Sequence, residues 1–181
     1  MRTYFSTFIP GFGELVQNQL KKLLKDFNLQ ELHDGLIVYR TDSDINDIKT
    51  LGFLNNSFIY VLPEEEIPVN LGQSFRVVFS KENELISVNK ERLARIENKI
   101  ARLNDLTIDR ANPDFEFWFL ERSEGTKLTG ARITKHPDYK TVLDKGQLRP
   151  ELAELLCIVS DPQKNDVVLD PFAGSGAIGL A

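Results

Sequence analysis

A short apolar run followed closely by glycines, in the last fifteen residues of the sequence, constrains the fold most. Val167–Leu169 is fully apolar, Asp170 follows it, and the stretch from Gly174 to Gly179 reads Gly-Ser-Gly-Ala-Ile-Gly. A short, fully apolar strand is typical of a parallel sheet that is buried on both faces. A glycine-rich turn between such a strand and a helix lets the backbone approach a ligand, while the helix presents free N–H groups. We therefore predict a strand, a ligand-binding loop and the start of a helix.

The spacing of this loop distinguishes two kinds of nucleotide ligand. The glycines fit the fingerprint of dinucleotide-binding loops, but in those loops the glycines turn directly off the strand. Here four residues separate Leu169 from Gly174, and one of them is the carboxylate of Asp170. A carboxylate repels a pyrophosphate and attracts a nearby cation by ~1–4 kcal/mol, depending on screening. The spacing therefore disfavours NAD and favours S-adenosylmethionine, which carries an ammonium and a sulfonium and no phosphate.

Two motifs carry a resemblance to a known family. The loop from Asp170 to Gly176 resembles the Asp-Pro-Phe-x-Gly-x-Gly loop of S-adenosylmethionine-dependent methyltransferases. The stretch Gly-Gln-Leu-Arg-Pro-Glu-Leu-Ala, from Gly146 to Ala153, resembles the Leu-Arg-Pro segment that opens the catalytic domain of THUMP-type RNA methyltransferases. These include the tRNA and 23S rRNA guanine-N2 enzymes. The resemblance implies that the cofactor-binding residues are Asp170, Pro171, Phe172, Ala173, Gly174, Ser175, Gly176, Gln147, Leu148 and Arg149.

The N-terminal part predicts elements in the order strand, helix, strand, strand, helix, strand. Strands are expected at Thr3–Ile9, Leu29–Leu32, Leu36–Arg40 and Ser57–Leu62, and helices at Phe12–Phe27 and Asp44–Phe53. Aromatic and β-branched residues mark the strands, and an Asp-Gly pair marks a hairpin turn. This order is typical of a ferredoxin-like domain, which we expect over residues 1–66.

A second block begins after an acidic run at Glu64–Glu66. It predicts a strand at Ser74–Ser80, a helix at Asn89–Leu103 and an aromatic strand at Phe115–Leu120. The aromatic strand could stack bases on an exposed sheet, although buried core is the more frequent role of such residues. The resemblance implies a THUMP-like RNA-binding segment over residues 67–125. The expected fold class is α+β: a ferredoxin-like domain, this THUMP-like α/β segment, and the first helix, strand and loop of a truncated Rossmann-like methyltransferase domain at residues 146–181.

The distribution of charge gives a candidate RNA contact. The whole chain has a net charge of −5, but the stretch from Glu121 to Pro150 carries seven cations against four carboxylates. We expect residues 126–145 to form a basic linker, and its composition also fits a linker with no binding role. The predicted contacts with RNA phosphates are Arg132, Lys135, His136 and Lys140.

Several features bound the class of protein. The single cysteine, Cys157, excludes an internal disulfide, and we expect it in the core of a helix at 147–160 beside a buried stripe of leucines that ends at Val159. No apolar run approaches the ~20 residues that span a bilayer, so we expect a cytoplasmic protein. The two histidines and one cysteine give no zinc-ligand spacing, and we assign no metal or catalytic residue.

One motif of the family does not occur in this sequence. The Asn/Asp-Pro-Pro-Tyr/Phe motif that holds the target base needs a Pro-Pro pair, and the chain has none. We therefore expect the N-terminal part of an RNA base methyltransferase, cut in the first helix of the catalytic domain and inactive alone, with structured RNA as its partner. A non-catalytic RNA-binding module with a vestigial loop and a DNA base N-methyltransferase stay open as alternatives. An NAD oxidoreductase is the least favoured.

Overall fold

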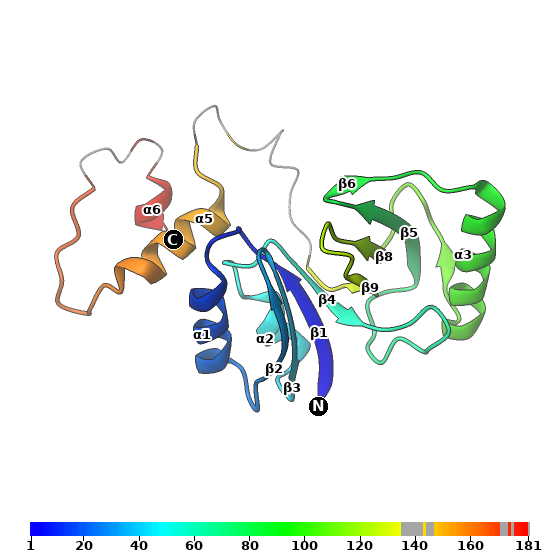
Figure 1. Cartoon of the computed structure of the whole chain (residues 1–181), viewed down its shortest axis with the longest axis horizontal. Helices are drawn as coiled ribbons and strands as arrows, with labels where there is room; N and C mark the ends of the chain where they lie inside the picture. Colours follow the sequence, from blue (N-terminus) through cyan, green and yellow to red (C-terminus); the bar gives the residue numbers. More distant parts are fainter. Residues whose placement is uncertain (135–142, 144–146, 171–173, 175, 181) are drawn as a thin grey trace. The chain divides into compact units, whose positions relative to one another are not determined.

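The computed structural model describes residues 1–134, 143, 147–170, 174 and 176–180, and within them the chain has a mixed α/β structure (Figure 1). The chain divides into two compact units. The first unit is Met1–Ser57 with Thr134–Ala181, and the second unit is Phe58–Ile133. None of the described helices is both long and apolar enough to cross a membrane.

The first unit begins with the expected order of strand, helix, strand, strand, helix, strand. The elements are β1 (Arg2–Thr7), α1 (Gly13–Leu23), β2 (Asn28–His33), β3 (Leu36–Thr41), α2 (Ile45–Lys49) and β4 (Asn56–Tyr60). The strands lie side by side in the order β2-β3-β1-β4, and β3 is antiparallel to both β1 and β2. The helix predicted at Asp44–Phe53 is shorter than expected, because a capping box at Asp44 starts α2 and the chain leaves the helix after Lys49.

Buried aromatic residues form the core of the first unit. Tyr4 and Phe5 are both fully buried, so side chains from both faces of β1 are covered. A polar contact crosses this core, because the Ser6 hydroxyl lies 3.2 Å from the Tyr39 hydroxyl and 2.8 Å from the Ser57 hydroxyl. Burial raises the pKa of Tyr39 above its ordinary value. The hydroxyls of Ser6, Tyr39 and Ser57 are therefore hydrogen-bonded to one another inside the core.

The second unit is a sheet with one helix packed against it (Figure 1). Its elements are β5 (Ser74–Lys81), β6 (Glu84–Leu85), α3 (Lys90–Asn104), β7 (Thr107–Ile108), β8 (Phe115–Glu121) and β9 (Lys127–Arg132). The strand order is β4-β9-β8-β5-β6, with β7 also paired to β5. The central pair β5 and β8 is parallel, and α3 supplies most of the crossover between them.

Phenylalanines from β5 and β8 form the core of the second unit. Phe75 stacks on Phe115 with ring centroids 5.9 Å apart, and Phe79 stacks on Phe119 at 4.7 Å. Phe117 is fully buried. These phenylalanines belong to the core, which was the more frequent of the two roles expected for the aromatic strand.

The expected basic linker at residues 126–145 differs from the structure in its first part. Residues 127–132 form β9, which pairs with both β8 and β4. The Thr129 hydroxyl donates to the backbone oxygen of Val61 at 2.8 Å, which ties β9 to the end of β4. For the same reason the boundary between the units falls at Ser57 rather than at Glu66. The pairing joins segments about 70 residues apart, so local sequence patterns do not reveal it.

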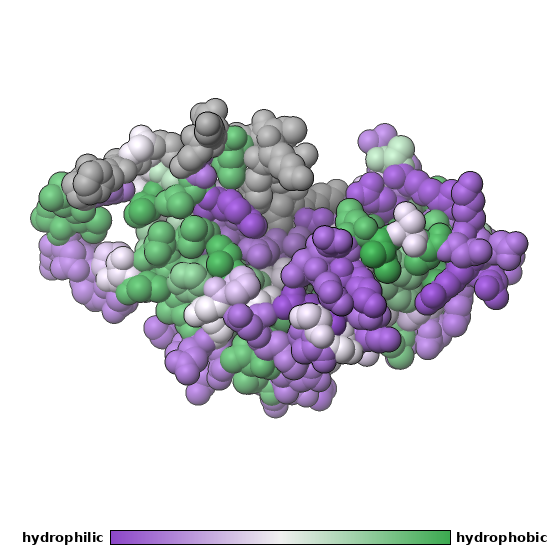
Figure 2. Space-filling model, turned by 45° about the horizontal axis from the view of Figure 1, so that its top comes forward, coloured by the Kyte–Doolittle hydropathy of each residue, from purple (hydrophilic) through white to green (hydrophobic). Residues whose placement is uncertain are grey.

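The predicted strand at Val167–Leu169 is wrong for the described residues. The three residues have no regular secondary structure, and Val167, Val168 and Leu169 are 96%, 69% and 83% exposed. A parallel strand is stable only beside other strands, and none of the strands described here pairs with this segment. Hydrophobic surface accordingly gathers at the end of the view where Figure 1 draws α5 (Pro150–Ser160) and the segment after it (Figure 2).

The buried face of α5 also differs from the prediction. Leu155 is buried as expected, but Val159 is 57% exposed, and Glu151 and Ala153 are buried instead. The predicted stripe assumed that α5 turns its leucines inward. Here α5 contacts α6 (Ala177–Leu180), and Glu154 lies against Gly52.

Candidate functional site

The C-terminal loop has two glycines in conformations that suit a tight turn. Gly174 has φ of 51° and Gly176 has φ of 75°, both in the left-handed region that L-residues with side chains avoid. A Cβ added at Gly176 would meet nothing within 4 Å, so the backbone faces open space there. Asp170, at the head of the loop, is partly exposed. The predicted positions Pro171, Phe172, Ala173 and Ser175 lie outside the described residues.

The segment before α5 brings further predicted cofactor-binding residues to the same unit. Gln147 and Leu148 are half-buried and precede the helix, and Arg149 is its N-cap residue, with Pro150 in the first turn. Arg149 donates from Nη2 to Glu151 Oε1 at 3.3 Å and to Asn55 Oδ1 at 3.4 Å. Arg149 therefore connects the start of α5 to the residue before β4, rather than pointing freely into solvent.

A contact between α5 and α6 places the glycine loop near the opening helix. Cys157 is half-buried and its thiol donates to the Ile178 oxygen at 3.4 Å. The cysteine is thus not simply a core residue, as the sequence suggested, because it joins the two helices. The structure brings together the N-terminal end of the loop's helix and the helix that carries Arg149.

Glu154 connects α5 to the segment at Gly52 in the same unit. The carboxylate occupies the space in which a Cβ at Gly52 would lie, so a side chain at position 52 would displace the carboxylate. Burial raises the pKa of Glu154, although a hydrogen bond from the Phe53 backbone opposes the shift. A partly buried carboxylate therefore stabilises the docked helix best in its protonated form.

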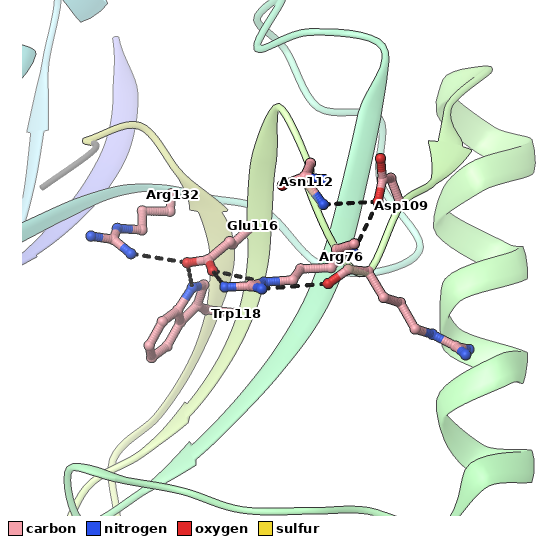
Figure 3. Close-up of polar contacts among 8 residues, drawn as sticks. Arg76, Asp109, Asn112, Glu116, Trp118 and Arg132 are labelled. Atoms are coloured by element: carbon pink, nitrogen blue, oxygen red, sulfur yellow. Dashed lines mark hydrogen bonds and ion pairs between the residues drawn. The ribbon is translucent and has the colours of Figure 1, made fainter. Parts of the chain in front are cut away.

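A polar cluster on the second unit surrounds one carboxylate. Glu116 lies on β8, and it accepts from Arg76 Nε on β5, from Arg132 Nη1 on β9 and from Trp118 Nε1, each at 2.9 Å (Figure 3). The parallel register places Arg76 directly opposite Glu116. Figure 3 shows Glu116 between Arg76 and Arg132, with the indole of Trp118 beside it. Burial works to raise the pKa of Glu116, but the three hydrogen bonds outweigh it and the pKa is lowered.

The cluster changes the interpretation of Arg132, one of the four predicted RNA contacts. Arg132 is only 20% exposed and its guanidinium pairs with Glu116. Its charge therefore stabilises the sheet rather than facing a ligand. Lys135, His136 and Lys140 lie outside the described residues. The indole of Trp118 packs edge-on against Phe58, with ring centroids 5.7 Å apart. Sequence reasoning missed the cluster because Arg76 and Glu116 are distant in the chain, and only the strand register brings them together.

The described residues contain no group of three or more His, Cys, Asp or Glu side chains that could hold a metal ion. Comparison with known proteins bears on the C-terminal segment first. Residues 137–180 match the family model described as RMKL-like, methyltransferase domain. This segment is therefore similar to the methyltransferase domain of RMKL-like proteins. The resemblance inferred from the glycine loop and the Leu-Arg-Pro segment is confirmed.

One curated relative of this chain is a tRNA (guanine(6)-N2)-methyltransferase of Thermus thermophilus. The two sequences are 31% identical over 110 residues, which are 59% of this chain and 32% of the relative. The chain thus spans about a third of the length of the curated relative that it matches.

Solved structures share the fold over nearly the whole length of this chain. TrmN from Thermus thermophilus matches with a TM-score of 0.71 and 22% identity, over 99% of this chain and 60% of TrmN. A predicted N6-adenine-specific DNA methylase from Listeria monocytogenes matches with a TM-score of 0.67 and 15% identity, over 99% of this chain and 53% of that one. A third protein, solved in complex with SAH, matches with a TM-score of 0.61 and 15% identity, over 98% of this chain and 53% of its own. Together with the family match, these findings support S-adenosylmethionine as the cofactor, as the glycine loop predicted.

Proposed function

We propose that this chain is the N-terminal, RNA-recognising part of an S-adenosylmethionine-dependent RNA base methyltransferase. The observation that carries the proposal is the match of residues 137–180 to a methyltransferase domain, in a chain whose fold follows TrmN over 99% of its length. The reaction is transfer of the methyl group from the sulfonium of S-adenosylmethionine to a base nitrogen. Guanine N2 is the preferred target, because the curated relative is a tRNA guanine-N2 methyltransferase.

The cofactor role rests on the loop at Asp170–Gly176. The carboxylate of Asp170 attracts the cationic cofactor, and the left-handed glycines Gly174 and Gly176 let the backbone approach it closely. Gln147, Leu148 and Arg149 border the same site from the start of α5. Bound S-adenosylmethionine supplies the methyl group on a good leaving group. The residues of this chain bind and orient it, and we assign no catalytic residue among them.

The RNA role rests on the architecture in front of the methyltransferase segment. The strand order β2-β3-β1-β4 and the two helices support a ferredoxin-like domain, and the sheet with α3 supports a THUMP-like domain. We keep Lys135, His136 and Lys140 as proposed phosphate contacts, whereas the charge of Arg132 is paired with Glu116. The 181-residue chain is expected to bind RNA without transferring methyl groups, because it has no Pro-Pro pair with which to form the family's base-holding motif.

A DNA base methyltransferase is the second candidate, because one solved structure with this fold is named as a DNA methylase. The test uses the full-length protein and S-adenosylmethionine labelled in its methyl group. Unmodified tRNA, rRNA and duplex DNA are offered separately, and transferred label is counted. We expect label in an RNA pool. Label in DNA alone would replace the proposal by the second candidate, and RNA binding without any label would identify a non-catalytic module.

A further inference from the structure

Four exposed cations follow one side of α3, the helix of the second unit. They are Arg92, Arg95, Lys99 and Arg102, spaced by three, four and three residues. At 3.6 residues per turn this spacing places them within roughly 80° of arc, along about 15 Å of the helix. We call these four residues the α3 stripe. The negative net charge of the whole chain conceals this local excess of cations.

The carboxylates of the second unit neutralise little of this charge. Helix α3 carries five cations against two carboxylates. One of these carboxylates, Glu97, is turned inward, where it is 1% exposed and bound to Arg110. Within the described part of the chain, Lys99 is the stripe residue with an ion pair, to Glu64 at 3.6 Å. The α3 stripe therefore presents three cations to solvent with no carboxylate held against them.

This arrangement works against the stability of the helix itself. Like charges at spacings of three and four residues repel, and the stripe contains three such neighbouring pairs. Arg92 also lies in the first turn, near the positive end of the helix dipole, where a cation is unfavourable. A stripe that costs the fold some stability is best explained by an anionic partner that neutralises it.

An open hollow beside the stripe offers room for such a partner. It has a volume of about 590 Å³ and is lined by Glu64, Arg95, Asn98, Lys99, Arg102 and Leu103. Figure 2 shows mainly hydrophilic surface at the end of the molecule where Figure 1 draws α3. Guanidinium, ammonium and amide groups all donate hydrogen bonds, which suits the oxygens of consecutive phosphates.

We propose that the α3 stripe binds the sugar-phosphate backbone of RNA. The kind of partner rests on the proposed function, whereas the surface rests on the geometry of α3. In the free protein Glu64 occupies the position of a phosphate next to Lys99. The carboxylate is displaced or repelled when RNA binds, so the acidic run after β4 weakens RNA binding rather than merely linking elements.

The test measures how the affinity of the 181-residue chain for tRNA depends on salt. The stripe variant R92Q/R95Q/R102Q removes three charges and keeps good helix formers. The matched control K21Q/K22Q/K25Q removes three exposed cations at and after the end of α1. Fluorescence anisotropy between about 50 and about 300 mM KCl gives the slope of log affinity against log salt. Each lost phosphate contact lowers the slope by about 0.7–0.9, so we expect a decrease of about 2–3 for the stripe variant alone.

A second substitution tests the surface with a gain instead of a loss. Glu64→Gln removes the competing carboxylate and is expected to tighten tRNA binding about two- to fivefold at low salt. Glu31→Gln, on exposed β2 of the first unit, changes the net charge equally and is expected to leave affinity unchanged. Thermal unfolding of the stripe variant should occur at the same temperature as wild type or slightly higher, because repulsion is removed.

Three outcomes would overturn the inference: an unchanged slope in the stripe variant, equal decreases in the stripe variant and its control, or no tRNA binding by the wild-type chain. Label transfer by the full-length protein is read separately. Transfer to RNA with an unchanged slope would retain the proposed function and refute the α3 stripe. A decreased slope in the stripe variant without any label transfer would retain the α3 stripe and refute the proposed function.

Discussion

Glu97 on α3 is nearly fully buried, yet its ion-pair partner Arg110 is 63% exposed. Two nitrogens of the guanidinium reach the carboxylate, Nε at 3.0 Å and Nη2 at 2.6 Å. The pairing also raises the pKa of Arg110, through the hydrogen bond and the charge of Glu97. Without this ion pair, Glu97 would be a buried carboxylate with no counter-charge, whereas Arg110 would still be solvated by water.

We expect Arg110→Ala to destabilise the second unit more than Glu97→Met does. Removing the arginine leaves a buried carboxylate without its counter-charge, whereas removing the carboxylate leaves a guanidinium that water can solvate. Urea unfolding of the two variants measures the free energy of unfolding directly. Equal losses would mean that the exposed partner contributes as much by packing as by charge.

Glu116→Gln is expected to lower the free energy of unfolding by ~1–2 kcal/mol at neutral pH, since hydrogen bonds to a charged group are lost. The lowered pKa of Glu116 gives the pH dependence its sign. The carboxylate stabilises the fold above its ordinary pKa, and this contribution disappears as the pH falls through the lowered value. The difference between wild type and variant, followed by unfolding from pH 7 to pH 3, should therefore shrink in acid. Glu84→Gln on the exposed strand β6 is the control that should show no such trend.

Glu154→Gln is expected to stabilise the docking of α5 at neutral pH. The raised pKa of Glu154 means that the folded state favours the protonated form. Its stabilisation is complete below the ordinary carboxyl pKa and is lost as the pH rises through the raised value. Glutamine stays neutral and can still accept from the Phe53 backbone. The unfolding temperature of the variant should exceed that of wild type at pH 7, and this difference should vanish at pH 4. Gly52→Ala, which displaces the carboxylate, should remove the difference by a separate route.

Asp170→Asn in the full-length protein is expected to weaken S-adenosylmethionine binding about tenfold, because a screened charge pair is worth ~1–2 kcal/mol. Calorimetric titration with S-adenosylmethionine measures the effect. The neighbouring surface carboxylate Asp166 provides the control in Asp166→Asn. If both variants bind as wild type does, Asp170 does not attract the cofactor and the glycines alone explain the loop.

Local patterns predicted most elements of the fold correctly. The hairpin at His33–Leu36, the helix capped by Asn89 and the strand at Phe115 all follow from turn residues, capping residues and periodicity. The pairing of strands was less accessible, because β9 contains a glycine and three polar residues and gains its stability from partners far away in the chain. The pairing with β8 and β4, rather than the intrinsic preference of its residues, makes this segment a strand.

The candidate site could be predicted from the sequence where the ligand-binding residues are consecutive in the chain. The loop at Asp170–Gly176 could be recognised from its amino-acid sequence. The match of residues 137–180 to a methyltransferase domain supports this interpretation. The Glu116 cluster and the Cys157 contact could not be recognised, because each joins residues from separate elements. The prediction of a strand at Val167–Leu169 was wrong for a different reason. Its composition was read correctly for a buried strand, but composition does not supply the neighbours that a strand needs.

The division of β4 between two units has a consequence for the protein during its synthesis. The strand β4 lies next to β1, which precedes it in the chain, but it also pairs with β9, which follows roughly 70 residues later. At a translation rate of about 5–20 residues per second, that edge stays unpaired for about 4–14 s. A nascent chain thus exposes an apolar strand edge, including Phe58 and Ile59, while the ribosome completes the second unit. Chaperones that capture strand edges would have their longest opportunity in that interval.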